Sequence, residues 1–132
     1  MPIVDFKTNV KIPNVEEYVK DLSKLSATLL GYPEEIICVS VLHDQPMSFK
    51  GTFDPTFLLS ITLTESTPDN NSKLSAAYFE HFKKTLGIDD DRGYISFLDP
   101  GKSNLGFKGK TVEQLLSAPA EKGSMADLAK ED

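Results

Sequence analysis

The chain contains one cysteine, Cys38, among its 132 residues. A single cysteine excludes an internal disulfide and any CxxC redox or zinc motif. Cys38 lies in the apolar segment IICVSVL, which predicts a small core residue. No apolar run reaches the ~18 residues of a membrane span, and charged residues from Asp5 onward interrupt the N-terminus before a secretory signal could develop. We therefore expect a cytoplasmic protein that does not enter a membrane.

Basic residues are also scarce. The 14 Lys and Arg residues face 20 Asp and Glu residues, giving a net charge of -6 and a pI near 4.9, and no cluster of basic residues is present. Nucleic acid is therefore not an expected partner. His43 and His81 lack the neighbouring residues of a catalytic triad or metal site, so no cofactor or metal is expected. With 39% hydrophobic residues, the chain can form one globular domain.

Hydrophobic periodicity predicts alternating strands and helices. A strand is expected from Ile3 to Val10, followed by a helix from Val15, with Asn14 as N-cap and Gly31 as the stop. Further strands are expected over residues 36–42, 56–63 and 94–98, and a second helix that begins after Asn71 or Ser72 and stops at Gly87.

The helix ends and the strands after them look like two versions of one unit. LLGYPEEIICVSV and TLGIDDDRGYISF align on Gly31 and Gly87, which lie 56 positions apart. Two β-α-β units predict an α+β fold, a four-stranded sheet with both helices on one face. Because the strand runs are apolar on both sides, especially residues 36–42, the opposite face should be buried against other copies of the chain. A homo-oligomer is therefore predicted.

The C-terminal segment differs in composition. Residues 112–132 are small and charged, and Pro119 and Gly123 interrupt them. Weak helical patterns surround Val112 and Leu115, and again Met125 and Leu128. We expect one domain over residues 1–111 and a partly helical or disordered extension over 112–132.

Pro2, directly after the initiator, has two interpretations. Proline cannot donate to a β-ladder, so it suits the first residue of a strand. A small second residue also permits removal of Met1, which would leave a free secondary amine at Pro2 that could serve as a catalytic base. The dipeptide alone favours the structural interpretation.

Together with Pro2, five segments of the chain resemble those of a known family. They are Thr8–Val10 (TNV), Leu29–Glu35 (LLGYPEE), Asp44–Pro55 (DQPMSFKGTFDP), Asp91–Phe97 (DRGYISF) and Asn104–Thr111 (NLGFKGKT). In this order they resemble the family of macrophage migration inhibitory factor and D-dopachrome tautomerase, over residues 1 to about 111. The resemblance implies a symmetric homotrimer, in which three sheets form a barrel-like core and an active site surrounds the N-terminal proline at each subunit interface.

The resemblance also implies a keto-enol tautomerase, an isomerase acting on phenylpyruvate-like or dopachrome-like aromatic compounds. Pro2 would be the acid-base catalyst, because a low-dielectric pocket lowers the pKa of its amine toward or below neutrality. Tyr94 would line the neighbouring subunit's pocket, whereas Phe107 is as readily a core aromatic as a pocket residue. Three further positions correspond to family substrate contacts: Tyr32 (a lysine in the family), Ser96 (an asparagine) and Thr64 (an isoleucine that uses its backbone).

Tyr32 is the main departure, because a phenol cannot supply the cation that binds a substrate carboxylate. We expect weak or substrate-shifted activity, unless Lys50, Lys102 or Lys108 replaces the charge. The alternative is a non-catalytic, cytokine-like module that binds a protein receptor, exported without a signal peptide as relatives can be. Reactions on small dicarboxylates need arginines beside the proline, and Arg92 is the only arginine.

Overall fold

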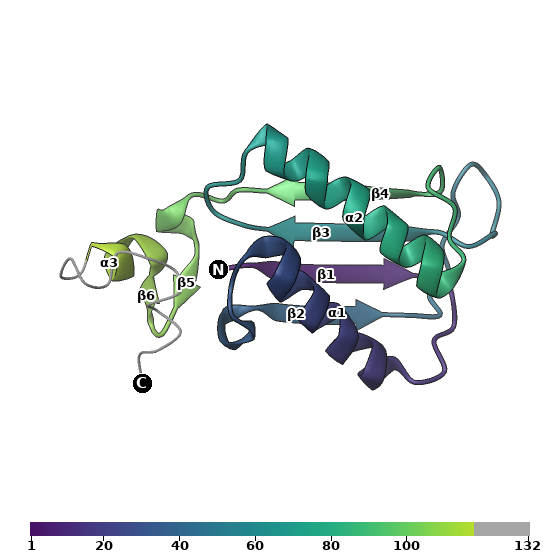
Figure 1. Ribbon diagram of the computed structural model, residues 1–132, viewed down its shortest axis with the longest axis horizontal. Coiled ribbons are helices and arrows are strands. Elements are labelled where there is room, and N and C mark those ends of the chain that lie inside the picture. Colours follow the sequence, from purple (N-terminus) through teal and green to yellow (C-terminus); the bar gives the residue numbers. More distant parts are fainter. Residues whose placement is uncertain (118–132) are drawn as a thin grey trace.

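The computed structural model describes residues 1–117, which form a four-stranded sheet with two long helices packed on one face (Figure 1). The main elements, in chain order, are β1 (Ile3–Thr8), α1 (Val15–Leu30), β2 (Cys38–Leu42), β3 (Phe57–Thr62), α2 (Pro68–Leu86) and β4 (Gly93–Leu98). Shorter elements are the 3-10 helices η1 (Glu34–Ile36) and η2 (Lys102–Asn104), the strands β5 (Gly106–Phe107) and β6 (Lys110–Thr111), and the helix α3 (Val112–Leu116).

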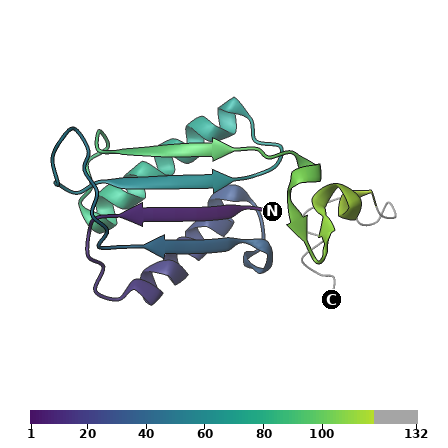
Figure 2. The ribbon, with the colours of Figure 1, turned by 180° about the vertical axis from the view of Figure 1, so that it is seen from behind.

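The sheet confirms the duplicated unit. Its strand order is β2-β1-β3-β4, with β1 parallel to β2, β3 parallel to β4, and β1 antiparallel to β3. Each parallel pair is joined through its own helix, and both helices cover the same face (Figure 1). Seen from behind, the other face carries no helix (Figure 2). The predicted α+β class, the four-stranded sheet and the helix placement are therefore confirmed.

Local capping explains the ends of both helices. The Asn14 side chain accepts a hydrogen bond from the Glu17 N–H (3.3 Å), and α1 ends at Gly31, whose φ of 75° is left-handed. Gly87 ends α2 in the same way, with φ 68°. The predicted start of α2 at Asn71 or Ser72 is wrong: Thr67 caps the helix by accepting from the Asn70 N–H, and Pro68 occupies the first turn, where its missing N–H costs nothing.

Three strands are shorter than predicted. β1 stops at Thr8 because the Thr8 hydroxyl accepts from the Val10 N–H (3.1 Å), which turns the chain out of the sheet. β2 begins at Cys38, since residues Glu34–Ile36 form η1 instead of extended backbone. β3 loses one residue at each end, and β4 begins one residue early, at Gly93.

The core lies between the sheet and the helices. Phe6 from β1, Phe57 from β3 and Phe82 from α2 stack at its centre, with 4.2 Å between the ring centroids of Phe6 and Phe82 and 4.8 Å between those of Phe57 and Phe82. Burying each such ring stabilises the fold by about 2–3 kcal/mol before entropy. The buried hydroxyl of Tyr78 donates to Ser26 Oγ (2.8 Å), which ties α2 to α1. Because all of these side chains point toward the helices, alternate strand residues point the other way.

We call the uncovered side of the sheet the bare face. The strand register arranges it in three rows: Cys38, Ile3, Thr62, Leu98; then Ser40, Asp5, Ser60, Ser96; then Leu42, Lys7, Leu58, Tyr94. The two outer rows expose large apolar side chains, whereas the middle row is polar, so the prediction of apolar strands on both sides holds only in part. Cys38 is exposed here, and its predicted core position is wrong because its strand position faces away from the helices.

η2, β5, β6 and α3 form a small unit beside the start of β1 (Figures 1 and 2). Thr111 and Gln114 form a capping box at the start of α3, and Val112 and Leu115 are buried against Met1 and Ile36. The weak helical pattern around Val112 is thus a helix, whereas the one around Met125 and Leu128 lies outside the described residues. Within residues 1–117, no helix is both long and apolar enough to cross a membrane.

Candidate active site

The five segments that carry the resemblance gather at opposite ends of the sheet (Figures 1 and 2). Two of them, Leu29–Glu35 and Asn104–Thr111, lie at the end where β1 begins, and we call this the amine end. The other three meet where β1 ends and β4 begins, and we call this the tyrosine end: Thr8–Val10 and Asp44–Pro55 lie there, and Asp91–Phe97 begins there and continues along β4. Pro2 belongs to the first end and Tyr94 to the second.

A cavity of about 260 Å³ opens at the amine end. It is lined by the start of β1 with Pro2, by η1 and the start of β2, and by Leu105 and Phe107 of the small unit. Pro2 is buried, and its carbonyl accepts from the Cys38 N–H (3.2 Å), which fixes the first residue of the strand. The structure therefore brings Phe107 and Pro2 to one cavity, as the pocket interpretation of Phe107 requires.

Met1 is only 5% exposed at this end. Its side chain packs in an apolar cluster with Ile36, Val112 and Leu115, and the half-buried side chains of Tyr32 and Phe107 pack against the same cluster. Removal of Met1 would leave apolar space directly beside the nitrogen of Pro2. That space has the character of a site for an aromatic or aliphatic group.

Burial shifts the pKa values of two ionisable groups at this end, the Met1 amine and the Tyr32 phenol. It lowers the pKa of the Met1 amine from 8.0 to about 6, while the nearby Glu65 carboxylate acts in the opposite direction and raises it. The amine is therefore mostly uncharged at neutral pH. Burial also raises the pKa of the Tyr32 phenol, and Glu65 raises it further, so Tyr32 remains a neutral hydrogen-bond donor.

Glu65 is a residue of this end that sequence reasoning missed. It has a left-handed φ of 65°, its N–H donates to Asp99 Oδ2 (3.0 Å), and its carboxylate pairs with Lys102 Nζ (2.6 Å). Thr64 beside it is 2% exposed. Only the position of Glu65 next to Thr64 could have drawn attention to it, because its contacts with Asp99 and Lys102 are distant in sequence.

Tyr94 and Ser96 do not reach Pro2 within one chain. Tyr94 pairs with Leu58, and Leu58 with Lys7, which lies five residues beyond Pro2 and hence roughly 16 Å along β1. Ser96 lies in the middle row of the bare face. Tyr94 lies in the outer row with Leu42, Lys7 and Leu58, and is 65% exposed. Among the predicted site residues, the chain thus unites Pro2, Tyr32 and Phe107 but leaves Tyr94 and Ser96 apart from them.

The three lysines weighed as substitutes for the missing charge have different surroundings. Lys102 pairs with Glu65 at the amine end, and Lys108 Nζ lies 5.7 Å from the centroid of the Phe107 ring. Lys50 pairs with Asp91 (2.6 Å) at the tyrosine end. Lys102 and Lys108 therefore lie at the same end of the sheet as the cavity. The Glu65 carboxylate balances the charge of Lys102.

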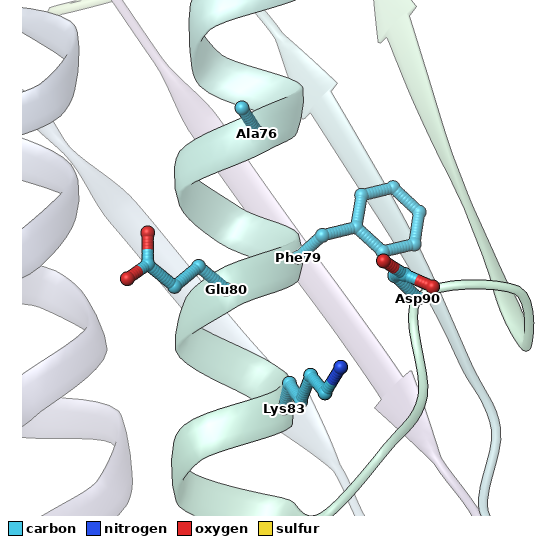
Figure 3. A pocket seen from close by; sticks show the side chains of 5 residues that line it. All are labelled: Ala76, Phe79, Glu80, Lys83 and Asp90. Atoms are coloured by element: carbon cyan, nitrogen blue, oxygen red, sulfur yellow. The ribbon is translucent and has the colours of Figure 1, made fainter.

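Another cavity, of about 470 Å³, lies on the outer side of α2, where Ala76, Phe79, Glu80, Lys83 and Asp90 line it (Figure 3). It contains none of the predicted site residues. In the part of the chain that the structure describes, no three His, Cys, Asp or Glu side chains gather closely enough to hold a metal ion. The chemistry suggested by Pro2 therefore points to the amine end.

Comparisons with known proteins agree with this geometry. A family model described as macrophage migration inhibitory factor (MIF) matches residues 1–113. A macrophage migration inhibitory factor homolog of Trichuris trichiura is 37% identical over 113 residues, covering 84% of this chain and 99% of the relative. The Rattus norvegicus macrophage migration inhibitory factor is 33% identical, covering 84% and 98%.

Solved structures give the same result. The macrophage migration inhibitory factor of Trichinella spiralis superposes with a TM-score of 0.76 at 29% identity, covering 83% of this chain and 98% of that one. A homologue from Prochlorococcus marinus gives a TM-score of 0.77 at 27% identity, with the same coverage.

Proposed function

The chain belongs to the macrophage migration inhibitory factor family, and from this we propose that it is a keto-enol tautomerase whose acid-base catalyst is the nitrogen of Pro2, freed by removal of Met1. The observation that carries the proposal is the buried Pro2 at an apolar cavity, where burial also lowers the pKa of the Met1 amine directly before it. A general base is most effective when its pKa lies near the working pH, and the same burial should move the freed amine of Pro2 in that direction.

In the proposed reaction, the proton moves between carbon and oxygen. The free amine of Pro2 removes a proton from the carbon next to the substrate carbonyl, electrons shift to the oxygen, and the resulting ammonium returns the proton to that oxygen to form the enol. Ketonisation is the reverse. Tyr32, as a neutral phenol near the cavity, supports the negative oxygen with one hydrogen bond. The ring of Pro2 holds its lone pair in one direction, which lowers the entropy cost of the transfer.

The cavity favours an aromatic substrate of the phenylpyruvate or dopachrome kind. Ile36, Leu105 and Phe107 provide apolar walls, and loss of Met1 would enlarge the space between them. Tyr32 supplies no cation for a substrate carboxylate, so binding or catalysis should be weaker by about 1.5–3 kcal/mol than with a lysine. A weak or substrate-shifted tautomerase is the consequence.

A homotrimer is part of the same proposal. Tyr94 lies at the tyrosine end and Ser96 in the middle row of the bare face, so they can complete a pocket around Pro2 only if another subunit carries them there. Four large apolar side chains of the bare face are 42–65% exposed in the single chain, which supports their burial against a second copy. The polar middle row would then pair Ser and Asp side chains across subunits.

The first test is the wild-type chain itself. Intact mass should show a chain that lacks Met1, and this chain should accelerate ketonisation of enol-phenylpyruvate, followed by the loss of enol absorbance. A chain that retains Met1 should be inactive, because its Pro2 nitrogen is an amide. A processed chain with no rate above buffer would overturn the proposal.

The second candidate function is a non-catalytic, cytokine-like module that binds a protein receptor. The observation that favours it is Tyr32, which stands near the carboxylate of Glu65 and offers no cation to the cavity. A protein that no longer catalyses the reaction would not need the positive charge of the family lysine, and a tyrosine could replace it at position 32.

Tyr32→Lys separates the two candidates. If the cavity is catalytic, a lysine should raise kcat/KM for enol-phenylpyruvate by about 10-fold or more, because an ammonium binds the substrate carboxylate by charge-assisted hydrogen bonds. Tyr32→Phe is the matched control, since it removes the hydroxyl without adding charge and should not increase the rate. The absence of turnover in both variants would favour the non-catalytic candidate.

A further inference from the structure

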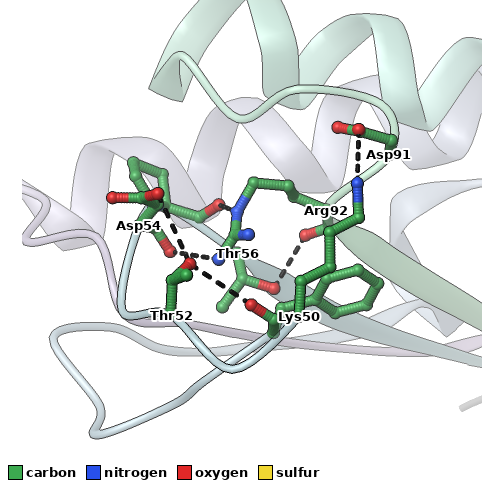
Figure 4. A network of polar contacts seen from close by, with 8 residues as sticks. Lys50, Thr52, Asp54, Thr56, Asp91 and Arg92 are labelled. Atoms are coloured by element: carbon green, nitrogen blue, oxygen red, sulfur yellow. Dashed lines mark hydrogen bonds and ion pairs between the residues drawn. The ribbon is translucent and has the colours of Figure 1, made fainter.

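The only arginine of the chain organises the tyrosine end (Figure 4). Arg92 is 8% exposed and lies one residue before β4. Its Nε donates to the Pro55 carbonyl (2.8 Å) and its Nη2 to the Asp54 carbonyl (2.9 Å). Its own carbonyl accepts from Thr56 Oγ1 (2.7 Å). Arg92 therefore joins the segment before β3 to the start of β4.

Arg92 also begins a series of contacts that leads through the Phe49 ring to Tyr94. Its guanidinium carbon lies 5.6 Å from the centroid of the Phe49 ring, within the range of a cation-π contact. The Phe49 and Tyr94 ring centroids are 5.4 Å apart, with an angle of 50° between the planes. Phe49 thus connects a buried cation to an exposed tyrosine.

The loop that carries Phe49 is itself fixed at several points. Phe49 and Thr52 exchange two backbone hydrogen bonds of 3.0 Å. Asn9, from the TNV segment, donates through Nδ2 to the carbonyls of Phe53 (3.0 Å) and Asp54 (3.1 Å), and its Oδ1 accepts from the Thr56 N–H (2.9 Å). These bonds place Phe49 against Tyr94 instead of leaving it on a free loop.

We propose that Arg92 is a positioning residue which, acting through Phe49, holds the ring of Tyr94 in the orientation needed at the Pro2 cavity of the neighbouring subunit. This rests on the proposed function. A tyrosine ring that projects from the sheet into a shared pocket can adopt several rotamers, and fixing one of them during substrate binding would cost affinity. The contacts of Arg92 with Phe49 and of Phe49 with Tyr94 fix the ring before substrate binds. They also explain why three segments of the resemblance meet so far from Pro2.

Fluorine NMR of protein labelled with 3-fluorotyrosine tests the positioning without relying on activity. The chain has four tyrosines, and Tyr94→Phe assigns the Tyr94 signal. In Phe49→Leu, that signal should shift toward free fluorotyrosine and sharpen, while the signals of Tyr18, Tyr32 and Tyr78 stay in place.

Phe53→Leu is the matched control, because it makes the same change in the same loop at a ring that is 79% exposed. Phe49→Tyr keeps the aromatic contact and should retain the wild-type signal. Arg92→Lys, which cannot repeat the two bonds to the carbonyls of Asp54 and Pro55, should move the Tyr94 signal in the same direction as Phe49→Leu. An unmoved Tyr94 signal in Phe49→Leu or in Arg92→Lys, or a shift of all four signals, would overturn the proposal.

Kinetics provide the second readout. Phe49→Leu should raise the KM for enol-phenylpyruvate several-fold with a smaller change in kcat, and it should have no further effect in a Tyr94→Ala background. A Phe49→Leu effect that persists without Tyr94 contradicts action through Tyr94. A wild type with no turnover defeats the proposed function, while the fluorine spectra still decide the positioning.

Discussion

Pro2→Gly should lower kcat/KM for enol-phenylpyruvate about 10²-fold or more, the size of effect that a positioned acid-base group contributes. Glycine also permits removal of Met1, but it leaves a primary amine on a flexible backbone, whereas the proline ring fixes the lone pair. Pro2 lies at the end of the sheet, with its side chain beside the cavity, so the core between the sheet and helices should remain intact.

A chain with alanine inserted between Met1 and Pro2 is the sharpest control. Processing then leaves alanine at the N-terminus, and Pro2 keeps its ring but its nitrogen becomes a non-basic amide. Loss of activity in both chains, with unchanged thermal unfolding, identifies the nitrogen as the essential group. Unaltered rates in either chain would exclude Pro2 as catalyst.

In the chain that lacks Met1, the pH dependence of kcat/KM should follow the protonation of the Pro2 amine. A protonated amine cannot accept a proton, so kcat/KM should fall as pH drops through the pKa of Pro2 in the folded chain. Burial should lower this pKa as it lowers that of the Met1 amine, which keeps the enzyme active at neutral pH. The Glu65 carboxylate raises the pKa of the Met1 amine, and we expect it to act in the same way on the amine of Pro2, so Glu65→Gln should move the acidic limb to lower pH.

Local chemistry explains which elements the sequence predicts correctly. The cap at Asn14 and the stop at Gly31 depend on residues within one helical turn, so both can be recognised without the fold. The start of α2 is misplaced because STPDNNS offers several capping side chains, although Thr67 followed by Pro68 is itself a local start signal. Cys38 was misjudged because an uninterrupted apolar strand does not reveal which of its sides the helices cover.

The residues of the candidate site also fall into those that the sequence predicts and those that it misses. Pro2, Tyr32 and Phe107 follow from segments whose order can be recognised, and the structure brings them to one end of the sheet. Glu65 and Arg92 act through contacts with residues more than 30 positions away, such as Asp99 for the first and Pro55 for the second. Only a folded chain shows such contacts.

Leu58→Lys should dissociate the proposed trimer and reduce ketonisation to the background rate. Leu58 is 42% exposed on the bare face, between Lys7 and Tyr94, so the new ammonium would be buried without a partner in the assembly. The side chain faces away from the core, and the isolated subunit should therefore stay folded. Light scattering should report a monomer with a wild-type circular dichroism spectrum, whereas Leu58→Met should remain trimeric.

Dissociation removes activity only if the site is shared, and mixed trimers test this point directly. Pro2→Gly and Tyr94→Ala chains should each be impaired alone, because every site then lacks one of the two groups. When equal amounts are refolded together, about a quarter of the sites should combine an intact Pro2 from one chain with an intact Tyr94 from its neighbour. Activity should then rise toward a quarter of the wild-type value. If Pro2 and Tyr94 served the same site from one chain, mixing would restore nothing, and the roughly 16 Å that separates them along β1 argues for the shared site.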